Sequence, residues 1–223
     1  MLRPQGCSGV VGAHDRATVY RFIMTDNPEK RRRSIRLAGY DYTEPGAYFI
    51  TICTHGRICT FGKILPVGEA SLNSFGEIAF EEWGLSAAVR EEIDSDAFVV
   101  MPNHVHGVVV IKHDIAGNNV GAQGLAPLQH PTPQQPSLYR PPRSLGSFVA
   151  GYKIAVTKRI NAIRKTPGTP VWQRNYYERV LRDDDELNRA RFYIQENPAR
   201  WADDDYNPVR KAENVTAIVD VIR

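Results

Sequence analysis

Hydrophobic and polar positions repeat with two different periods along this chain, and those periods predict strands and helices in its first half. Residues 47–54 are rich in aromatic and β-branched side chains and follow a Pro-Gly pair, which predicts a buried strand. Apolar residues then recur every three or four positions from Leu72 to about Ile93, which predicts a helix. The β-rich runs 97–101 and 104–111 surround a Pro-Asn pair and predict an antiparallel hairpin.

The second half continues the alternation of helix and strand. Apolar residues from Leu145 to Ile163 form the stripe of an amphipathic helix, and residues 171–181 have the composition of a strand. Asp183 or Asp184 can cap a last helix, which Pro198 ends. The order is β-α-β-β-α-β plus a helix, so we expect an α+β, ferredoxin-like split β-α-β fold. A four-stranded antiparallel sheet would have helices on one face, plus the C-terminal helix.

Length and composition limit the class of protein. At 223 residues, 42% hydrophobic and 24% charged, the chain suits one soluble globular domain. No apolar run approaches the roughly eighteen residues of a membrane span. The three cysteines lack C-x-x-C spacing and indicate neither a disulfide framework nor a zinc knuckle, so a reducing cytoplasm is the expected compartment.

Changes in pattern divide the chain into segments. Residues 1–30 show no organised period, so we expect a poorly ordered N-terminal extension, with Met24 as an alternative start. Residues 31–201 form the predicted domain, and 202–223 the predicted C-terminal tail. Within the domain, residues 114–143 are rich in Gly, Gln and Pro, which predicts a flexible insertion.

The positive charges gather in two places. The net charge of +3 and the pI near 8.8 permit a nucleic-acid partner without establishing one. In an arbitrary protein, a solvated tail and a solvated helix face are the favoured explanation of two such clusters. The first cluster comprises Lys30, Arg31, Arg32, Arg33 and Arg36, and the second comprises Lys153, Lys158, Arg159, Arg164 and Lys165.

Two histidines are candidate metal ligands. His104 and His106 flank Val105 in a predicted strand, so both imidazoles share one face while Val105 points to the core. Two nitrogens can then converge on one ion. The pattern is also that of two half-exposed strand histidines without a ligand.

Tyr193 and Asn197 lie four residues apart in the last helix and therefore on one face. A nucleophile and a ligand could share a site there. The alternative is an interfacial core tyrosine and a helix-end asparagine. Periodicity does not rank Tyr193 above Tyr152, Tyr176 or Tyr177.

Several motifs together resemble one family. They are RRRSIRL from Arg31, YDYTEPGAYFITICT from Tyr40, MPNHVHG from Met101, VWQRNYYE from Val171 and FYIQENP from Phe192. In this order and separation they resemble the REP-associated tyrosine transposases, which are single-tyrosine members of the HUH endonuclease superfamily. The resemblance spans about residues 31–201.

The resemblance implies the residue roles. His104 and His106 match the family's metal histidines, and Tyr193 matches its catalytic tyrosine. Asn197 falls where relatives place a polar metal ligand, commonly Gln. Arg31, Arg32, Arg33 and Arg36, with Lys153, Lys158 and Arg159, become expected DNA contacts.

The resemblance also implies a reaction. The expected enzyme is a metal-dependent single-stranded DNA endonuclease and strand transferase, which recognises REP-type hairpins and cleaves through a 5′-phosphotyrosine intermediate. Mg²⁺ or Mn²⁺ is the expected cofactor. We expect a cytoplasmic, nucleoid-associated monomer or homodimer. The alternatives are a replication-initiator-like nickase and a non-catalytic single-stranded nucleic-acid-binding domain.

Overall fold

The structure is a computed structural model that describes residues 41–112 and 143–210. The predicted extension 1–30, the arginines at 31–36 and nearly all of the insertion 114–143 lie outside these ranges. No helix within the described ranges is long and apolar enough to cross a membrane. The elements in chain order are β1 (Gly46–Cys53), η1 (His55–Arg57), β2 (Gly62–Ile64), β3 (Ala70–Leu72), α2 (Ser74–Ala88), β4 (Ile93–Met101), β5 (His104–Ile111), α3 (Leu145–Arg164), β6 (Tyr177–Leu181), α4 (Asp184–Glu196) and η2 (Pro198–Asp203).

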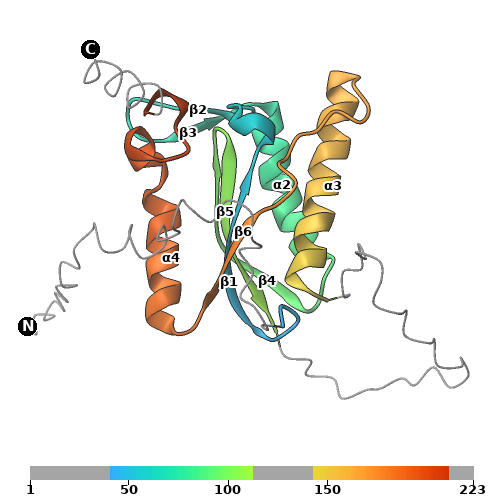
Figure 1. Cartoon of the computed structure of the whole chain (residues 1–223), viewed down its shortest axis with the longest axis vertical. Coiled ribbons are helices and arrows are strands. Elements are labelled where there is room, and N and C mark those ends of the chain that lie inside the picture. Colours follow the sequence, from blue (N-terminus) through green and yellow to red (C-terminus); the bar gives the residue numbers. More distant parts are fainter. Residues whose placement is uncertain (1–40, 113–142, 211–223) are drawn as a thin grey trace, which may run out of the picture. The chain divides into compact units, whose positions relative to one another are not determined.

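The main sheet has the order β4-β5-β1-β6, and every neighbouring pair is antiparallel. This is the order of a ferredoxin-like split β-α-β unit, so the predicted fold class is confirmed. Figure 1 shows α2 and α3 on one side of this sheet and α4 on the other. The central strands β5 and β1 are therefore covered on both faces.

Strand alternation separates two interiors. Ile50, Val105 and Val109 belong to the apolar core under α2 and α3, where Trp83 stacks on Phe98 at a centroid distance of 4.2 Å. Residues of the opposite parity face α4, and this second interior contains polar side chains. The chain thus has an apolar core under α2 and α3 and a second interior under α4 that contains polar side chains.

Helix α4 is fixed to the sheet at several points. The Asp183 side chain accepts a hydrogen bond from the Glu186 N–H at 2.7 Å and caps the helix. The Arg191 guanidinium donates to both carboxylate oxygens of Asp96 on β4, at 2.9 and 2.6 Å. Ala190 and Ile194 are buried against the sheet. Because the helix is held along its length, the position of Tyr193 is well defined.

Several element bounds differ from the sequence predictions. The predicted strand 171–181 begins only at Tyr177, and the preceding residues 173–175 turn their carbonyls toward the Lys153 ammonium. The predicted helix 72–93 is shorter, since Leu72 belongs to β3 and Ile93 begins β4. The β2–β3 hairpin was not predicted, because three-residue strands carry no measurable period.

Gly107 provides a test of the main core. A Cβ atom there would collide with the Trp83 ring, so we expect Gly107→Ala to lower the free energy of unfolding by about 1–3 kcal/mol. Gly84, inside α2, faces open space, and Gly84→Ala should instead stabilise the fold by up to about 1 kcal/mol. Urea denaturation measures both changes. Equal effects of the two substitutions would contradict the described packing.

Candidate metal centre and its tyrosine

The two histidines of β5 lie side by side on the sheet face that α4 covers. His104 and His106 are both 0% exposed, while Val105 between them packs in the opposite core. The sequence therefore placed the imidazoles on the correct face. It did not predict their complete burial, which follows from the central position of β5 and the segment after α4.

The imidazoles point their Nε2 atoms at each other. The two Nε2 atoms are 2.9 Å apart, and each Nδ1 has its own neighbour. The His104 Nδ1 lies 2.9 Å from Asn103 Oδ1, and the His106 Nδ1 lies 2.8 Å from Thr51 Oγ1. The Asn103 Nδ2 donates to the backbone oxygens of Arg57 and Tyr206, so its Oδ1 is the acceptor for His104 Nδ1–H. That tautomer leaves the His104 Nε2 lone pair available to a cation.

Burial also sets the charge of the pair. It lowers the pKa of His106 to about 3. It holds the pKa of His104 well below the usual value, with further lowering by His106 and Arg57. Both side chains are therefore neutral near pH 7, which is the form that binds metal ions.

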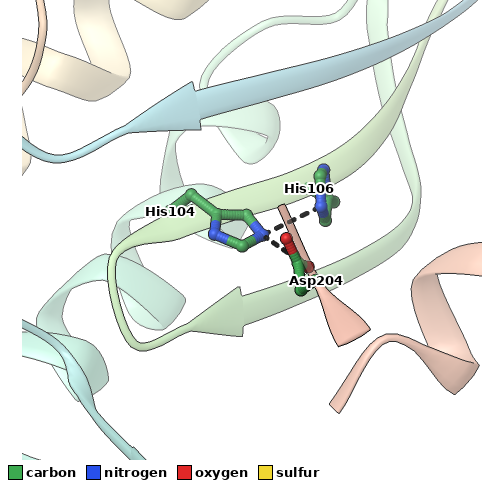
Figure 2. Close-up of side chains that lie close together, drawn as sticks. All are labelled: His104, His106 and Asp204. Carbon is green, nitrogen blue, oxygen red and sulfur yellow. Dashed lines mark hydrogen bonds and ion pairs between the residues drawn. The ribbon is translucent and has the colours of Figure 1, made fainter. Parts of the chain in front are cut away.

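Asp204 supplies a carboxylate to the same point. Its Oδ2 lies 3.9 Å from His104 Nε2, and its Oδ1 accepts the Tyr206 N–H at 2.7 Å. Potential ligand atoms of His104, His106 and Asp204 all lie within 4.8 Å of one another, and Figure 2 shows the three side chains converging. Burial raises the pKa of Asp204 to about 6, against the lowering by the hydrogen bond from the Tyr206 backbone and by the nearby Asn197 amide.

Asn197, which the resemblance implied as a metal ligand beside the two histidines, lies next to Asp204. It is fully buried and close enough to Asp204 to lower that residue's pKa. Neither of its amide heteroatoms, nor Asp204 Oδ2, makes a well-formed hydrogen bond. Buried polar atoms of this kind cost about 1–3 kcal/mol each unless a partner satisfies them. Two neutral imidazoles, a carboxylate and an amide oxygen thus fit a divalent cation.

Tyr193 packs directly against the histidine pair. Its ring meets the His106 ring edge-on at a centroid distance of 5.2 Å and the Phe49 ring at 5.8 Å. Tyr152, a competitor in the sequence, lies in the other core, where its hydroxyl donates to Ala79 O at 3.0 Å. Tyr177 is the first residue of β6, and Tyr176 directly precedes that strand and is half-buried. Tyr193 is thus the candidate tyrosine that lies against the histidine pair.

The segment after α4 covers the group. The Tyr206 ring lies 4.6 Å from the His104 ring, and the Arg57 guanidinium sits 4.7 Å over Tyr206. Asp204 and Tyr206 were missed in the sequence because both fall in the predicted tail 202–223. That tail begins inside packed structure, since Asp204 and Asn207 are buried. The acidic run 203–205 was the available signal, although acidic runs are common on surfaces.

The expected DNA-binding cations are differently placed. The Lys153 ammonium is engaged with backbone carbonyls, and Arg159 pairs with Glu81 and Glu82 at 2.7 and 2.9 Å. Lys158 is exposed. The sequence showed these charges correctly but could not show that two of them have partners within the chain.

The fold and the group together define a ferredoxin-like α+β protein with a buried His-His-Asp cluster beside a tyrosine. No protein-family model matches the chain. An uncharacterized protein of Haemophilus influenzae strain Rd is 37% identical over 174 residues, which cover 78% of this chain and 91% of that protein. The chain belongs to the same family as this Haemophilus influenzae protein.

Two solved structures are similar at low identity. One is a REP-associated tyrosine transposase bound to a REP hairpin, with 14% identity, a TM-score of 0.48, and coverage of 74% of this chain and 73% of that one. The other is a candidate transposase of Deinococcus radiodurans R1, with 16% identity, a TM-score of 0.35, and coverage of 72% and 96%.

The pKa of Asp204 makes cation binding depend on pH. The pKa of Asp204 rises from about 3.8 in the unfolded chain to about 6 in the folded one. Its protonated form therefore stabilises the fold below pH 3.8, and this stabilisation is lost as the pH rises through about 6. A cation offsets the ionised form, so 1 mM MnCl₂ should raise the Tm more at pH 7.5 than at pH 5. At one hundred times Kd the gain is about 2.7 kcal/mol, or roughly 5–10 °C.

Differential scanning fluorimetry measures this shift. His106→Ala should abolish it, and Asp204→Asn should reduce it and remove its rise between the two pH values. An equal shift in wild type and both variants would place the cation elsewhere.

Proposed function

We propose that the chain is a metal-dependent single-stranded DNA endonuclease and strand transferase of the transposase type, with Tyr193 as its nucleophile. The observation that carries this proposal is the packing of the Tyr193 ring on His106, within a buried group that fits a divalent cation. The motifs MPNHVHG and YIQENP add the substrate class, because their resemblance implies REP-type hairpins.

The proposed reaction is a reversible exchange of phosphoesters. The Tyr193 oxygen forms a bond to phosphorus as the bond to the 3′ oxygen breaks, leaving a 5′-phosphotyrosine and a free 3′-hydroxyl. The phenol proton goes to solvent, and the departing 3′ oxygen gains a proton. Attack by a 3′-hydroxyl on the phosphotyrosine reverses these changes, so rejoining needs no nucleotide cofactor.

The chain's own residues prepare this step. A bound divalent cation would offset negative charge on a phosphate oxygen. His104, His106 and Asp204 would hold it, with Asn197 as the neighbouring amide. Asn103 and Thr51 orient the imidazoles through their Nδ1 atoms, while α4 aims Tyr193 at the same point.

The proposed nucleophile and the four residues proposed to surround the cation lie together within one chain, because α4 packs on its own sheet (Figure 1). The Arg191–Asp96 pair fixes this arrangement. We therefore propose that a single chain can complete its active site without a second copy.

Access to the group requires movement. His104, His106, Asn197 and Asp204 are fully buried, so a phosphate can reach them only if covering side chains such as Tyr206 move away. The same burial favours a second candidate, a non-catalytic single-stranded nucleic-acid-binding domain in which the histidines are structural. An origin-specific nickase would share the chemistry and differ in its DNA target.

Tyr193→Phe tests the nucleophile. It removes only the hydroxyl, so folding and hairpin binding should persist while the covalent protein–DNA adduct falls below detection. The assay incubates labelled single-stranded hairpins with Mn²⁺ and resolves adducts on a denaturing gel. Tyr176→Phe is the matched control and should retain the adduct. An adduct with Tyr193→Phe, or none with wild type across varied hairpins, would contradict the assignment.

The form of the DNA tests the substrate class. A single strand exposes its bases, whereas pairing hides them, so a palindromic hairpin should be cut much faster than the same sequence annealed to its full complement. Initial cleavage rates at fixed metal concentration measure the difference. Equal rates would favour an ordinary duplex nuclease.

A further inference from the structure

A groove lies beside α3, away from the buried histidines. It has a volume of about 860 Å³ and runs between the C-terminal half of α3 and residues 165–174, which lead toward β6. In Figure 1 this connection leaves the end of α3 and returns beside the helix. Pockets of about 300–1,000 Å³ are typical of small-ligand sites, so the groove can hold a nucleotide.

Both walls of the groove are tied together. The Asn161 amide donates to Thr169 O at 2.8 Å and joins the connection to the helix. Farther along, the Lys153 ammonium donates to the carbonyl of Gln173 at 2.8 Å. Lys165 reverses the chain with a left-handed backbone (φ 56°), a conformation that glycine normally provides. The groove is therefore formed by the fold and needs no ligand to exist.

The lining is charged with one sign only. It contains basic residues and no acidic ones, so it attracts anions. Lys158, Lys165 and Arg174 are exposed at the groove, where phosphates could reach them. The basic lining residues are Lys153, Lys158, Lys165 and Arg174.

The rest of the lining suits a flat, partly polar ring. Ile154 is 66% exposed, and Pro167, Pro170 and Val171 add apolar surface. Asn161 Oδ1 and Trp172 Nε1 belong to lining residues, are buried, and have no hydrogen-bond partner. Both atoms are shielded within those residues, so the exposed lining itself consists of apolar side chains beside cations. Apolar surface next to positive charge is the chemistry that the base and the phosphate of a nucleotide match.

The groove wall is also adjacent to the strand beside the histidines. The His55 N–H donates to Val171 O at 2.8 Å, and the Gln173 N–H donates to Cys53 O at 2.9 Å. Cys53 is the register partner of His104. The groove and the buried group thus lie at the same end of β1.

We propose that this groove binds one unpaired nucleotide of single-stranded DNA, with its base on the apolar lining and its phosphates on Lys158 and Lys165. The choice of DNA rests on the proposed function, whereas the site rests on the groove itself.

Paired substitutions on α3 test the site. Ala162 is exposed and lines the groove, so Ala162→Trp should fill it. Ile163 is the next residue, 56% exposed and outside the lining, and Ile163→Trp is the matched control. Affinity for a fluorescent oligo(dT) is measured by fluorescence anisotropy. EDTA is present to remove divalent cations, so the proposed cleavage does not interfere. Ala162→Trp should weaken binding about ten-fold, the effect of losing one stacked base, and Ile163→Trp should not.

A second experiment compares two charge reversals, one at the groove and one outside it. Lys158→Glu should weaken binding and its salt dependence. Arg182→Glu makes the same change of charge just after β6, outside the groove lining, and should have little effect. A 4-thiothymidine oligonucleotide should crosslink to the peptide spanning residues 153–174. Thermal melts verify that each variant folds.

The outcomes separate this proposal from the proposed function. Wild-type affinity in Ala162→Trp and Lys158→Glu overturns the groove, even if the Tyr193 adduct forms. Weakened binding in those two variants alone supports the groove, even if no adduct forms. Tighter binding of the matching (rU) oligonucleotide, lost in the same variants, overturns DNA as the occupant.

Discussion

The contact between two buried imidazoles on β5 constrains the rest of the site. Residues two apart on a strand share a face, so packing Val105 in the apolar core turns both His104 and His106 toward α4. Their Nε2 atoms then meet at 2.9 Å. At that distance two lone pairs repel, so a proton or a cation must lie between them or beside them. Neutral His106 can supply the proton from Nε2 while its Nδ1 accepts from Thr51, and a bound cation would take the place of that proton.

The two interiors of the fold differ in what they contribute. Under α2 and α3, the aromatic cluster around Trp83 buries apolar surface and stabilises the sheet. Under α4, buried polar groups such as Asn197 and Asp204 lack well-formed hydrogen bonds at some atoms, which lowers stability. The first interior offsets the cost of the second, as is common where a fold carries chemistry.

The sequence predicted what depends on local periodicity. The bounds of β5, the stripe of α3 and the Asp183 cap of α4 follow from spacing alone, as does the shared face of the histidines. Asp204 could not be found this way, because it reaches His104 only after α4 has docked and the chain has turned through η2. The Lys153 ammonium shows the same limit. Its charge is visible in the sequence, but its three carbonyl partners depend on tertiary structure.

The end of β1 connects the groove to the histidines through a few hydrogen bonds. Thr54 forms an isolated bridge with Trp172, which lines the groove. The Thr54 N–H donates to Asn103 O at 2.9 Å, and the Asn103 side chain holds the His104 Nδ1. A shift of Trp172 on nucleotide binding would therefore act on the residue that orients a proposed metal ligand. The groove would then position the DNA strand and also affect the proposed cleavage site, since both contact the backbone at the end of β1.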